Sequence, residues 1–374
     1  MTAPPRAGTH LVLVSDQPVP SLVPVLDPAL GVKRVWLAAT AYRKTHAEHL
    51  AETLRRHGRE VEILAVERPF ERAAVAAQFR AWLGRAPEGG LAVNLTGGSK
   101  PMAIAAYEAC REAGVPAYYV RIDTHALAWL HPEGRPDHPL PPVLTLEDIL
   151  TANGVEMVAL SREAPYPEGW LRLAHDIAAD PHLQGRLARL GNQDVPRNPP
   201  DALKGKGLLH RTELGWIWAG DDARRFVAGG WLEALVFDVL DRLRRDASDL
   251  GIHDLACNVR IRRPAQAGEA LDGELDVAVM RENTLFVVEC KSGRMDDRHK
   301  GNAKDQERMI LNLADVGELL GGLRGRTALV SRNELTPNQA RLVRHLGIQV
   351  VQGAEALARL EMPLRLWLGH PAGP

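Results

Sequence analysis

Apolar residues in the first third of the chain fall alternately into short runs and into helical spacing. The runs at His10–Asp16, Val32–Thr40 and Leu91–Thr96 predict strands, whereas Arg43–His57 and Phe70–Leu83 have the spacing of amphipathic helices. Such an alternation is typical of an α/β domain with a doubly wound parallel sheet. In these sheets ligands bind beyond the carboxyl ends of the strands, so those ends are the first places to search for a site.

Two of the predicted strand ends carry polar residues in patterns suited to an anion. The first is Ser15–Pro18, after the first strand, and the second is Asn94–Met102, where two adjacent glycines precede a predicted helix. Adjacent glycines let the backbone approach a ligand, N–H groups at a helix start favour an anion, and Thr96, Ser99 and Lys100 add donors. A Gly-Gly turn beside a helix cap also occurs for structural reasons alone. The GxxxxGK[ST] pattern is absent, so a phosphate cradle here is not a P-loop.

The remaining two thirds of the chain predict a connector and a second domain. Between 155 and 203 a helical stretch is followed by the proline-rich GNQDVPRNPPD, which is typical of a linker. Trp216 and Trp218 then mark a new packed unit. We therefore expect a first domain over 1–154, a helical connector and linker over 155–203, and a second domain over 204–374.

Ionisable residues interrupt the apolar pattern of the second domain. Apolar positions recur at helical spacing over Gly229–Leu240, and Glu233 lies at the edge of that stripe, where it could simply complement the helix dipole. The segments 273–280 and 285–291 predict the two strands of a hairpin. Asp276 lies inside the first of them, where a lone buried carboxylate costs several kcal/mol unless it is paired, protonated or bound to a metal.

Glu289 and Lys291 project to the same side of the second hairpin strand, because a strand alternates its faces. Taken alone, they could form a surface ion pair. Together with Asp276, however, two carboxylates without histidine or cysteine side chains beside them select a hard cation such as Mg²⁺ or Mn²⁺. A lysine beside such a metal can orient or help to deprotonate an attacking water and offset charge on a scissile phosphate.

Composition and charge narrow the possible functions. Cys110, Cys257 and Cys290 show no CxxC spacing, so neither a zinc cluster nor a disulfide framework is indicated. The net charge is −1, from 46 Lys and Arg against 47 Asp and Glu, so any nucleic-acid binding must be local, with candidate patches at Arg260–Arg263 and Lys291–Lys304. No stretch is long and apolar enough for a membrane span, and the N-terminus lacks a signal-peptide pattern, so we expect a cytoplasmic protein.

The two polar strand ends of the first domain resemble the signature motifs of CARF domains, the cyclic oligoadenylate sensors of type III CRISPR systems. The segment Leu144–Gly154 also resembles the ending of such a domain. The resemblance implies a Rossmann-like homodimer whose signature loops meet around one symmetric cyclic RNA. Ser99 stands where many relatives carry threonine, which keeps the hydroxyl. The implied ligand contacts come from both loops: Ser15, Asp16, Gln17, Pro18, Asn94, Thr96, Gly97, Gly98, Ser99, Lys100 and Met102.

The order of ionisable residues in the second domain resembles the PD-(D/E)xK nuclease superfamily, which has a restriction-endonuclease-like α/β core. The resemblance implies that Asp276 and Glu289 bind the metal together with the backbone carbonyl of Cys290, and that Glu233 joins through the metal's water shell. Lys291 is the implied catalytic lysine. The family's proline before the aspartate is missing, and Glu274 in its neighbourhood is a possible further acidic residue. On the helix expected at Asn302–Leu320, Gln306 could reach the site or face solvent.

Together the two resemblances point to the single-CARF nuclease effectors of type III CRISPR defence. They imply an endonuclease that cleaves single-stranded DNA or RNA with Mn²⁺ or Mg²⁺ and is activated allosterically by a cyclic oligoadenylate, with cyclic tetra-adenylate as the expected form. One alternative is a ligand-responsive regulator that binds nucleic acid without cleaving it. A ring nuclease that only degrades its ligand is another class, but it leaves the second domain without a role.

Overall fold

The computed structural model describes residues 7–85, 89–190, 195–263, 271–293, 300–321 and 325–369. Contacts divide the chain into two compact units. The first consists mainly of residues up to Met157, and the second mainly of Val158–Ile261 and Asp272–Pro371. None of the helices in the described segments combines the length and the hydropathy that a membrane crossing requires.

Within the described residues, the first unit contains a seven-stranded sheet in the order β3-β2-β1-β4-β5-β6-β7. The pairings from β3 to β5 are parallel, and β5-β6 and β6-β7 are antiparallel. The predicted α/β fold with a parallel-rich sheet is confirmed. The strands are β1 (Thr9–Leu13), β2 (Arg34–Thr40), β3 (Glu60–Val66), β4 (Leu91–Asn94), β5 (Ala117–Arg121), β6 (Ala126–His131) and β7 (His138–Pro139).

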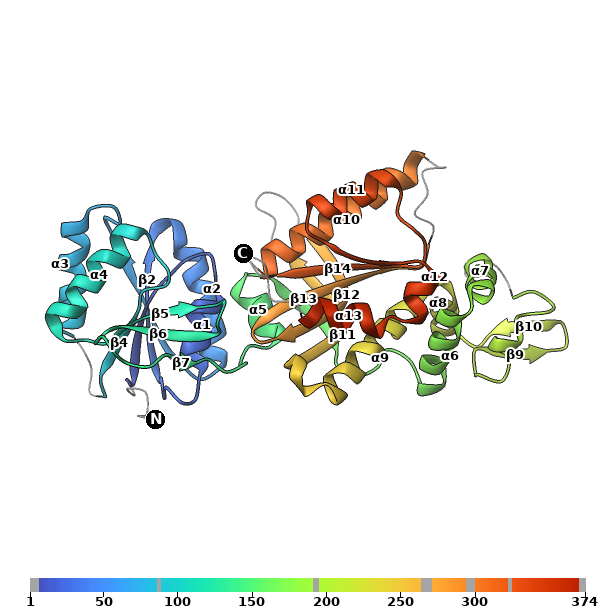
Figure 1. The fold of residues 1–374 in the computed structure, drawn as a ribbon, viewed down its shortest axis with the longest axis horizontal. Helices are drawn as coiled ribbons and strands as arrows, with labels where there is room; N and C mark the ends of the chain where they lie inside the picture. The colour runs from blue at the N-terminus through green and yellow to red at the C-terminus, as the bar shows by residue number, and fades with distance from the viewer. Residues whose placement is uncertain are drawn as a thin grey trace. The chain divides into compact units, whose positions relative to one another are not determined.

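Helices cover both faces of this sheet, with α3 and α4 on one side and α1 and α2 on the other (Figure 1). The face towards α3 and α4 forms one apolar core with Leu11, Trp36, Val93 and other strand residues. The helix α5 packs on α2, and the imidazole Nε2 of His57 lies 2.7 Å from Oδ1 of Asp148. The helices are α1 (Val19–Leu26), α2 (Lys44–Arg56), α3 (Arg72–Leu83), α4 (Lys100–Ala113) and α5 (Leu146–Ala152).

The strand order places a topological switch point between β1 and β4. From β1 the chain moves outward to β2 and β3 and then returns to β4 on the other side of β1. The connections after β1 and β4 therefore leave the sheet in opposite directions, which opens a crevice at the carboxyl ends of these two strands. The loops Ser15–Pro18 and Leu95–Ser99 both begin at this crevice.

The second unit is built around a six-stranded sheet, counted over the described residues, in the order β15-β14-β13-β12-β11-β8. The predicted hairpin is present: β12 and β13 are antiparallel, and the two turn residues Glu282 and Asn283 both have positive φ, as a tight hairpin turn requires. The pairs β13-β14 and β14-β15 are parallel. The strands are β8 (Glu156–Ser161), β11 (Ile252–Arg263), β12 (Leu271–Arg281), β13 (Thr284–Lys291), β14 (Arg326–Ser331) and β15 (Gln349–Gln352).

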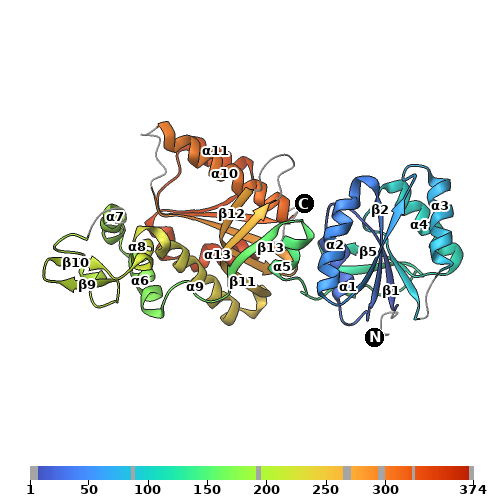
Figure 2. The same ribbon diagram turned by 180° about the vertical axis from the view of Figure 1, so that it is seen from behind.

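Helices also flank this second sheet, and a small separate hairpin, β9 (Leu209–Thr212) with β10 (Gly215–Trp218), lies away from the sheet, beyond α7 and α8 (Figure 2). Contacts place α10 against β13 and β14, whereas one large apolar core joins α6, α7, α9 and α13 to residues of β12 and β13. The helices are α6 (Glu168–Ala179), α7 (Pro181–Leu190), α8 (Asp221–Arg225), α9 (Trp231–Asp246), α10 (Lys300–Gly321), α11 (Pro337–His345), α12 (Ala354–Ala358) and α13 (Glu361–Gly369).

Two details differ from the sequence expectation. The strand β8 lies in the segment expected to be a helical connector, and it forms one end of the second sheet. The predicted helix start at Gly229 is a π-helical turn, Phe226–Gly230, which joins α8 to α9. The two glycines leave room for neighbouring side chains, because a Cβ on Gly229 would lie 2.4 Å from Oγ of Ser292 and one on Gly230 would lie 2.4 Å from Oη of Tyr166.

Candidate active site and ligand-binding loops

Two carboxylates meet where the β12-β13 hairpin opens. The paired register ends at Val277 opposite Val288, and one step further it places Asp276 opposite Glu289. Oδ2 of Asp276 accepts a 2.7 Å hydrogen bond from the backbone N–H of Cys290. Val277, Val288 and Cys290 join the apolar core, so the alternation of the strands directs Asp276 and Glu289 to the opposite face.

Negative charge accumulates around Asp276. Burial raises the pKa of its carboxyl to about 8, and the charges of Glu289 and Glu233 add to this effect, although the N–H of Cys290 and the charge of Lys291 oppose it. Burial also raises the pKa of Glu233, and the neighbouring carboxylate of Glu274 raises it further. Glu233, in the first turn of α9, is therefore close enough to the hairpin carboxylates to repel them.

Lys291 neutralises part of this charge. Its Nζ lies 2.7 Å from Oε1 of Glu289. Burial lowers the pKa of the lysine, but the charge of Glu289 and its hydrogen bond outweigh this effect, so the net shift of the pKa is upward. Lys291 is thus an ammonium ion at neutral pH, suited to stabilising negative charge or orienting a water molecule.

The donor chemistry of this cluster suits a hard cation. Asp276 and Glu289 offer carboxylate oxygens, and the repulsion that raises the pKa of Asp276 is what a bound cation would relieve. The residues thus fit Mg²⁺ or Mn²⁺ by donor type and charge, although over the described part of the chain no three His, Cys, Asp or Glu side chains are already arranged to hold a metal ion.

The raised pKa of Asp276 predicts a pH-dependent stability in metal-free protein. The folded state holds a proton on Asp276 up to about pH 8, whereas the unfolded chain releases it near 3.8, so the folded state binds more protons in between. Stability should therefore fall as pH rises from about 4 to about 8. Thermal denaturation in EDTA should show a melting temperature that falls by a few degrees more over this range in wild type than in Asp276→Asn. Equal falls in the two proteins would show that Asp276 is not the group responsible.

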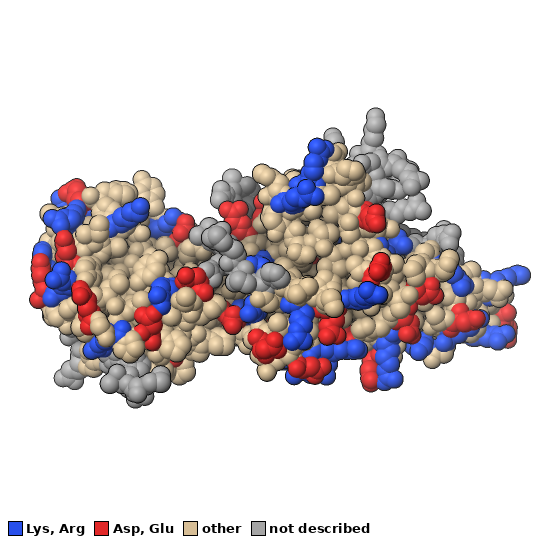
Figure 3. Space-filling view, in the orientation of Figure 1, with Lys and Arg blue, Asp and Glu red and all other residues tan. Residues whose placement is uncertain are grey.

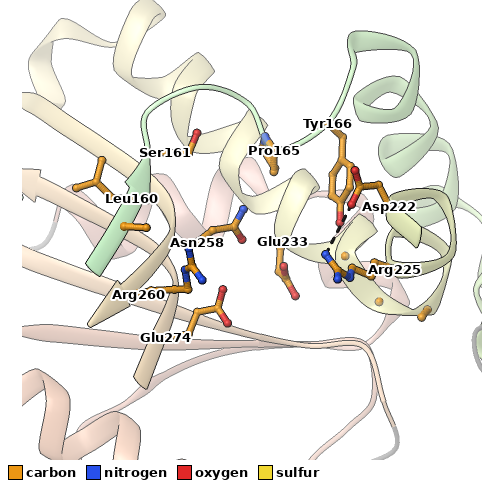
Figure 4. Close-up of a pocket in the computed structure, with 14 residues that line it drawn as sticks. Leu160, Ser161, Pro165, Tyr166, Asp222, Arg225, Glu233, Asn258, Arg260 and Glu274 are labelled. Atoms are coloured by element: carbon orange, nitrogen blue, oxygen red, sulfur yellow. Dashed lines mark ion pairs between the residues drawn. The ribbon is translucent and has the colours of Figure 1, made fainter. Parts of the chain in front are cut away.

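Glu233 also lines a cavity of about 850 Å³ in the second unit (Figure 4). Glu274 and Arg260 line the same cavity, whereas Asp276, Glu289 and Lys291 are not among its lining residues. Glu233 is thus the predicted site residue that connects the hairpin cluster with this cavity.

The sequence also indicated Gln306 and two basic patches as candidates for the site. Gln306 does not lie on a purely solvated face, because its Oε1 accepts a 2.7 Å hydrogen bond from Nε2 of Gln339 on α11. Arg262 lies 3.5 Å from Glu156. Of the second candidate patch, positions 294–299 are outside the described residues. On the face shown in Figure 3, basic and acidic side chains are interspersed, as the net charge predicts.

In the first unit, an exposed ion pair joins the loop after β1 to the segment that follows β2. Oγ of Ser15 accepts a hydrogen bond from the N–H of Gln17, and Oδ2 of Asp16 forms a 3.2 Å ion pair with Arg43. Arg43 and its 88% exposed neighbour Tyr42 were not among the residues expected near this loop from the sequence. Both follow β2 directly, and because β2 is parallel to β1, the two strands end at the same edge of the sheet. This position could have identified them as neighbours of the loop after β1.

Asn94 and Thr96 hold the loop after β4 in place. Asn94 is only 1% exposed; its Oδ1 accepts hydrogen bonds from the N–H and hydroxyl of Thr96, and its Nδ2 donates to the carbonyl of Pro20. Oγ1 of Thr96 in turn accepts from the N–H of Val120. Met102 is fully buried in the core. The buried side chains of Asn94 and Met102 therefore support the loop from inside the domain. Ser99 is the N-cap of α4, and the exposed Lys100 is the first residue of that helix.

The two loops touch at Gly97. A Cβ on this residue would lie 2.0 Å from the carbonyl oxygen of Leu13, so any side chain here would push the loop away from β1. Gly98 has a φ of +74°, which glycine adopts without strain. Ser99 caps α4, because its Oγ accepts a hydrogen bond from the N–H of Met102. The predicted glycines and cap thus bring the loop after β4 against the end of β1 and fix the start of α4.

Two family models match the chain. The model described as the Card1 CARF domain matches residues 9–149, and the model described as the Card1-like endonuclease domain matches residues 220–370. No protein of curated function resembles the chain closely enough in sequence to count as a match.

Several solved structures share the fold. Protein VC1899 from Vibrio cholerae is 23% identical with a TM-score of 0.85, and the match covers 98% of this chain and 99% of that one. Can2 from Sulfobacillus thermosulfidooxidans, solved in complex with cyclic tetra-adenylate, is 23% identical with a TM-score of 0.76 and coverage of 98% for both chains. A type III CRISPR defence DNA nuclease activated by cyclic oligoadenylate is 21% identical with a TM-score of 0.58; the match covers 89% of this chain and 46% of that one.

Proposed function

Since the chain belongs to the Card1-like family, which joins a CARF domain to an endonuclease domain, we propose that it is a metal-dependent nuclease of type III CRISPR defence activated by cyclic tetra-adenylate. The observation that carries the proposal is the meeting of Asp276, Glu289 and Lys291 on adjacent strands of the endonuclease domain. Two solved structures of the same fold are named for a cyclic oligoadenylate ligand or activator, which supports the sensor assignment.

In the nuclease domain, Asp276 and Glu289 would hold Mn²⁺ or Mg²⁺ together with the backbone carbonyl of Cys290, and Glu233 would act through the metal's water shell. The metal supplies Lewis acidity at the scissile phosphate and lowers the pKa of a bound water. The ammonium of Lys291 orients the attacking water and stabilises the negative charge that develops on the phosphate during cleavage. The substrate class is single-stranded DNA or RNA.

In the sensor domain, the loops at the switch point would bind the cyclic oligoadenylate. Lys100, the exposed first residue of α4, offers positive charge to a phosphate, and Ser15 and Gln17 lie in the facing loop after β1. Thr96, whose hydroxyl is bonded to Asn94 and to the N–H of Val120, holds the loop after β4 in shape. A symmetric cyclic ligand matches a two-fold arrangement of identical loops, so the proposed active form is a homodimer. The ligand activates the enzyme by binding the active arrangement more tightly than the inactive one.

The dependence of cleavage on activator concentration tests the sensor assignment. The exposed Lys100 begins α4, and losing one charge-assisted phosphate contact costs roughly 1.5–3 kcal/mol. Lys100→Ala should therefore raise the concentration of cyclic tetra-adenylate needed for half-maximal cleavage by about tenfold or more, with the maximal rate unchanged. Lys33→Ala is the matched control, because Lys33 precedes β2 at the opposite edge of the sheet. An unchanged half-maximal concentration in Lys100→Ala would place the ligand elsewhere.

A regulator that binds nucleic acid without cleaving it is the second candidate. It predicts that cyclic tetra-adenylate changes the affinity for single-stranded nucleic acid while the substrate stays intact with either metal. The cluster of Asp276, Glu289 and Lys291 favours cleavage, since binding alone needs no closely spaced carboxyl groups beside a half-buried lysine.

A further inference from the structure

The cavity beside Glu233 is formed by elements from distant parts of the chain. Its walls come from the end of β8, the segment before α6, the turn Phe226–Gly230 and strands β11 and β12. Figure 4 shows side chains from opposite walls pointing into the same space. Its volume of about 850 Å³ lies within the range of about 300–1,000 Å³ that is typical of ligand sites. The polar residues on its walls include Tyr166, Arg225, Glu233, Asn258, Arg260 and Glu274.

Two arginines line this cavity, and Arg260 is the one whose guanidinium can bind a ligand without first leaving an ion pair within the described residues. Within the described residues no carboxylate lies in ion-pairing distance of its guanidinium, whereas Arg225 lies 3.7 Å from Asp222. Arg260 is exposed on β11, on the same face as Asn258. A guanidinium offers donors in a planar fork that matches the oxygens of a phosphate, so Arg260 is suited to a phosphodiester group.

Asn258 occupies an unusual backbone conformation in the same wall. Its φ of +51° lies in the left-handed region, within the strand β11. Such outliers among non-glycine residues gather at binding sites, where the strain is held by the surrounding structure. The amide of Asn258 offers both a donor and an acceptor, and Figure 4 shows it directed into the cavity. This combination can read the edge of a nucleobase.

The opposite wall is closely packed. The ring of Tyr166 packs edge-on against Phe226 at 5.1 Å and beside Trp170 at 5.6 Å, and its hydroxyl faces the close-packed Gly230. The cavity is therefore formed before any ligand binds. A preformed recess of this size takes an unstacked nucleotide, whereas a base inside a duplex would first have to leave its stack.

We propose that this cavity holds a nucleotide next to the scissile bond of a single-stranded substrate, with Arg260 binding a backbone phosphate and Asn258 contacting the base. The proposal rests on the nuclease function proposed above. Glu274 in the cavity wall lies two positions before Asp276 on β12, so both carboxylates project from the same face of that strand. A strand held by Arg260 would therefore lie beside the proposed cleavage site. The repulsion that Glu233 and Glu274 exert on a phosphate is offset by Arg260 and by the proposed metal.

Steady-state cleavage by the full-length protein with cyclic tetra-adenylate and Mn²⁺ tests the phosphate contact, using single-stranded DNA and RNA of one sequence. Arg260→Ala should raise KM about tenfold with kcat within about twofold, and Arg260→Lys should recover part of the loss. The slope of log KM against log salt should fall by about 0.7, the value for one phosphate contact on a single strand. Arg244→Ala is the matched control, since Arg244 pairs with Asp241 near the far end of α9. Equal KM and equal salt slopes in Arg260→Ala and Arg244→Ala would overturn the proposal.

A second variant tests the base contact. Asn258→Gly removes the amide while glycine keeps the positive φ, so the strand should retain its shape. Mapping of the cut positions on a mixed-sequence strand should show a changed base preference next to the cut, with an unchanged salt slope. An identical cutting pattern would contradict a base contact at Asn258.

A binding measurement separates failure of this proposal from failure of the nuclease function. Fluorescence anisotropy of a labelled single strand with Glu289→Gln protein measures the binding affinity, including the Arg260 contact, in a variant that should leave the strand intact during the measurement. Adding Arg260→Ala to this variant should weaken binding about tenfold even if no cleavage is found in wild type. Unchanged binding would overturn the cavity assignment, whereas wild type that binds but never cleaves would overturn only the nuclease function.

Discussion

Glu289→Gln protein should cleave single-stranded substrate about 10²–10³-fold more slowly than wild type at saturating cyclic tetra-adenylate and Mn²⁺. Glutamine keeps the size of the side chain but removes the negative charge that would bind the metal. It also removes the charge that raises the pKa of Lys291 and the repulsion that raises the pKa of Asp276. The loss should appear in kcat, measured by single-turnover cleavage of a labelled strand.

The control for this prediction is Glu355→Gln, which makes the same chemical change on the surface of the same domain. Glu355 lies 4.0 Å from Arg359 with both side chains largely exposed, and exposed pairs contribute little to stability. Its cleavage rate should equal that of wild type. Activator binding should be unchanged in both variants. A Glu289→Gln enzyme that retained wild-type cleavage would remove the hairpin cluster from the mechanism.

Gly97→Ala should raise the concentration of cyclic tetra-adenylate required for activation by about a hundredfold. The new Cβ would lie 2.0 Å from the carbonyl oxygen of Leu13, so the loop after β4 must move away from β1. Overpacking of this kind costs about 1–3 kcal/mol, so the sensor domain should also melt at a lower temperature. Isothermal titration with the ligand measures the loss of affinity directly.

Gly8→Ala is the matched control for that experiment. Gly8 lies at the opposite edge of the same sheet, and a Cβ there would come no closer than 3.7 Å to its neighbours. It should bind and respond to the ligand as wild type does. If Gly97→Ala also responded normally, the ligand would not depend on the contact between the two loops.

The parts of the fold that follow from local pattern could be predicted from the sequence. The alternation of apolar runs and helical spacing identified the parallel-rich sheet, and the turn before Thr284 identified the hairpin that carries Asp276 and Glu289. These features depend on neighbours in sequence, so periodicity and turn chemistry are sufficient to find them.

Features that depend on distant pairing were not visible in the sequence. The segment Glu156–Ser161 is half exposed, and its apolar run of four residues, Met157–Leu160, is too short to separate a strand from part of a helix. Its strand character comes from its place beside β11. The contact between Arg43 and Asp16 exists because β2 pairs with β1. The cavity likewise combines Tyr166, Asn258 and a turn near residue 228, which only the folded chain brings together.

The most direct test of the central claim is a cleavage time course of labelled single-stranded DNA and RNA with Mn²⁺, in the presence and absence of cyclic tetra-adenylate. We predict cleavage that requires both the metal and the ligand. A substrate that stays intact with both present, or that is cut equally fast without the ligand, would contradict the proposal that this chain is a ligand-activated nuclease.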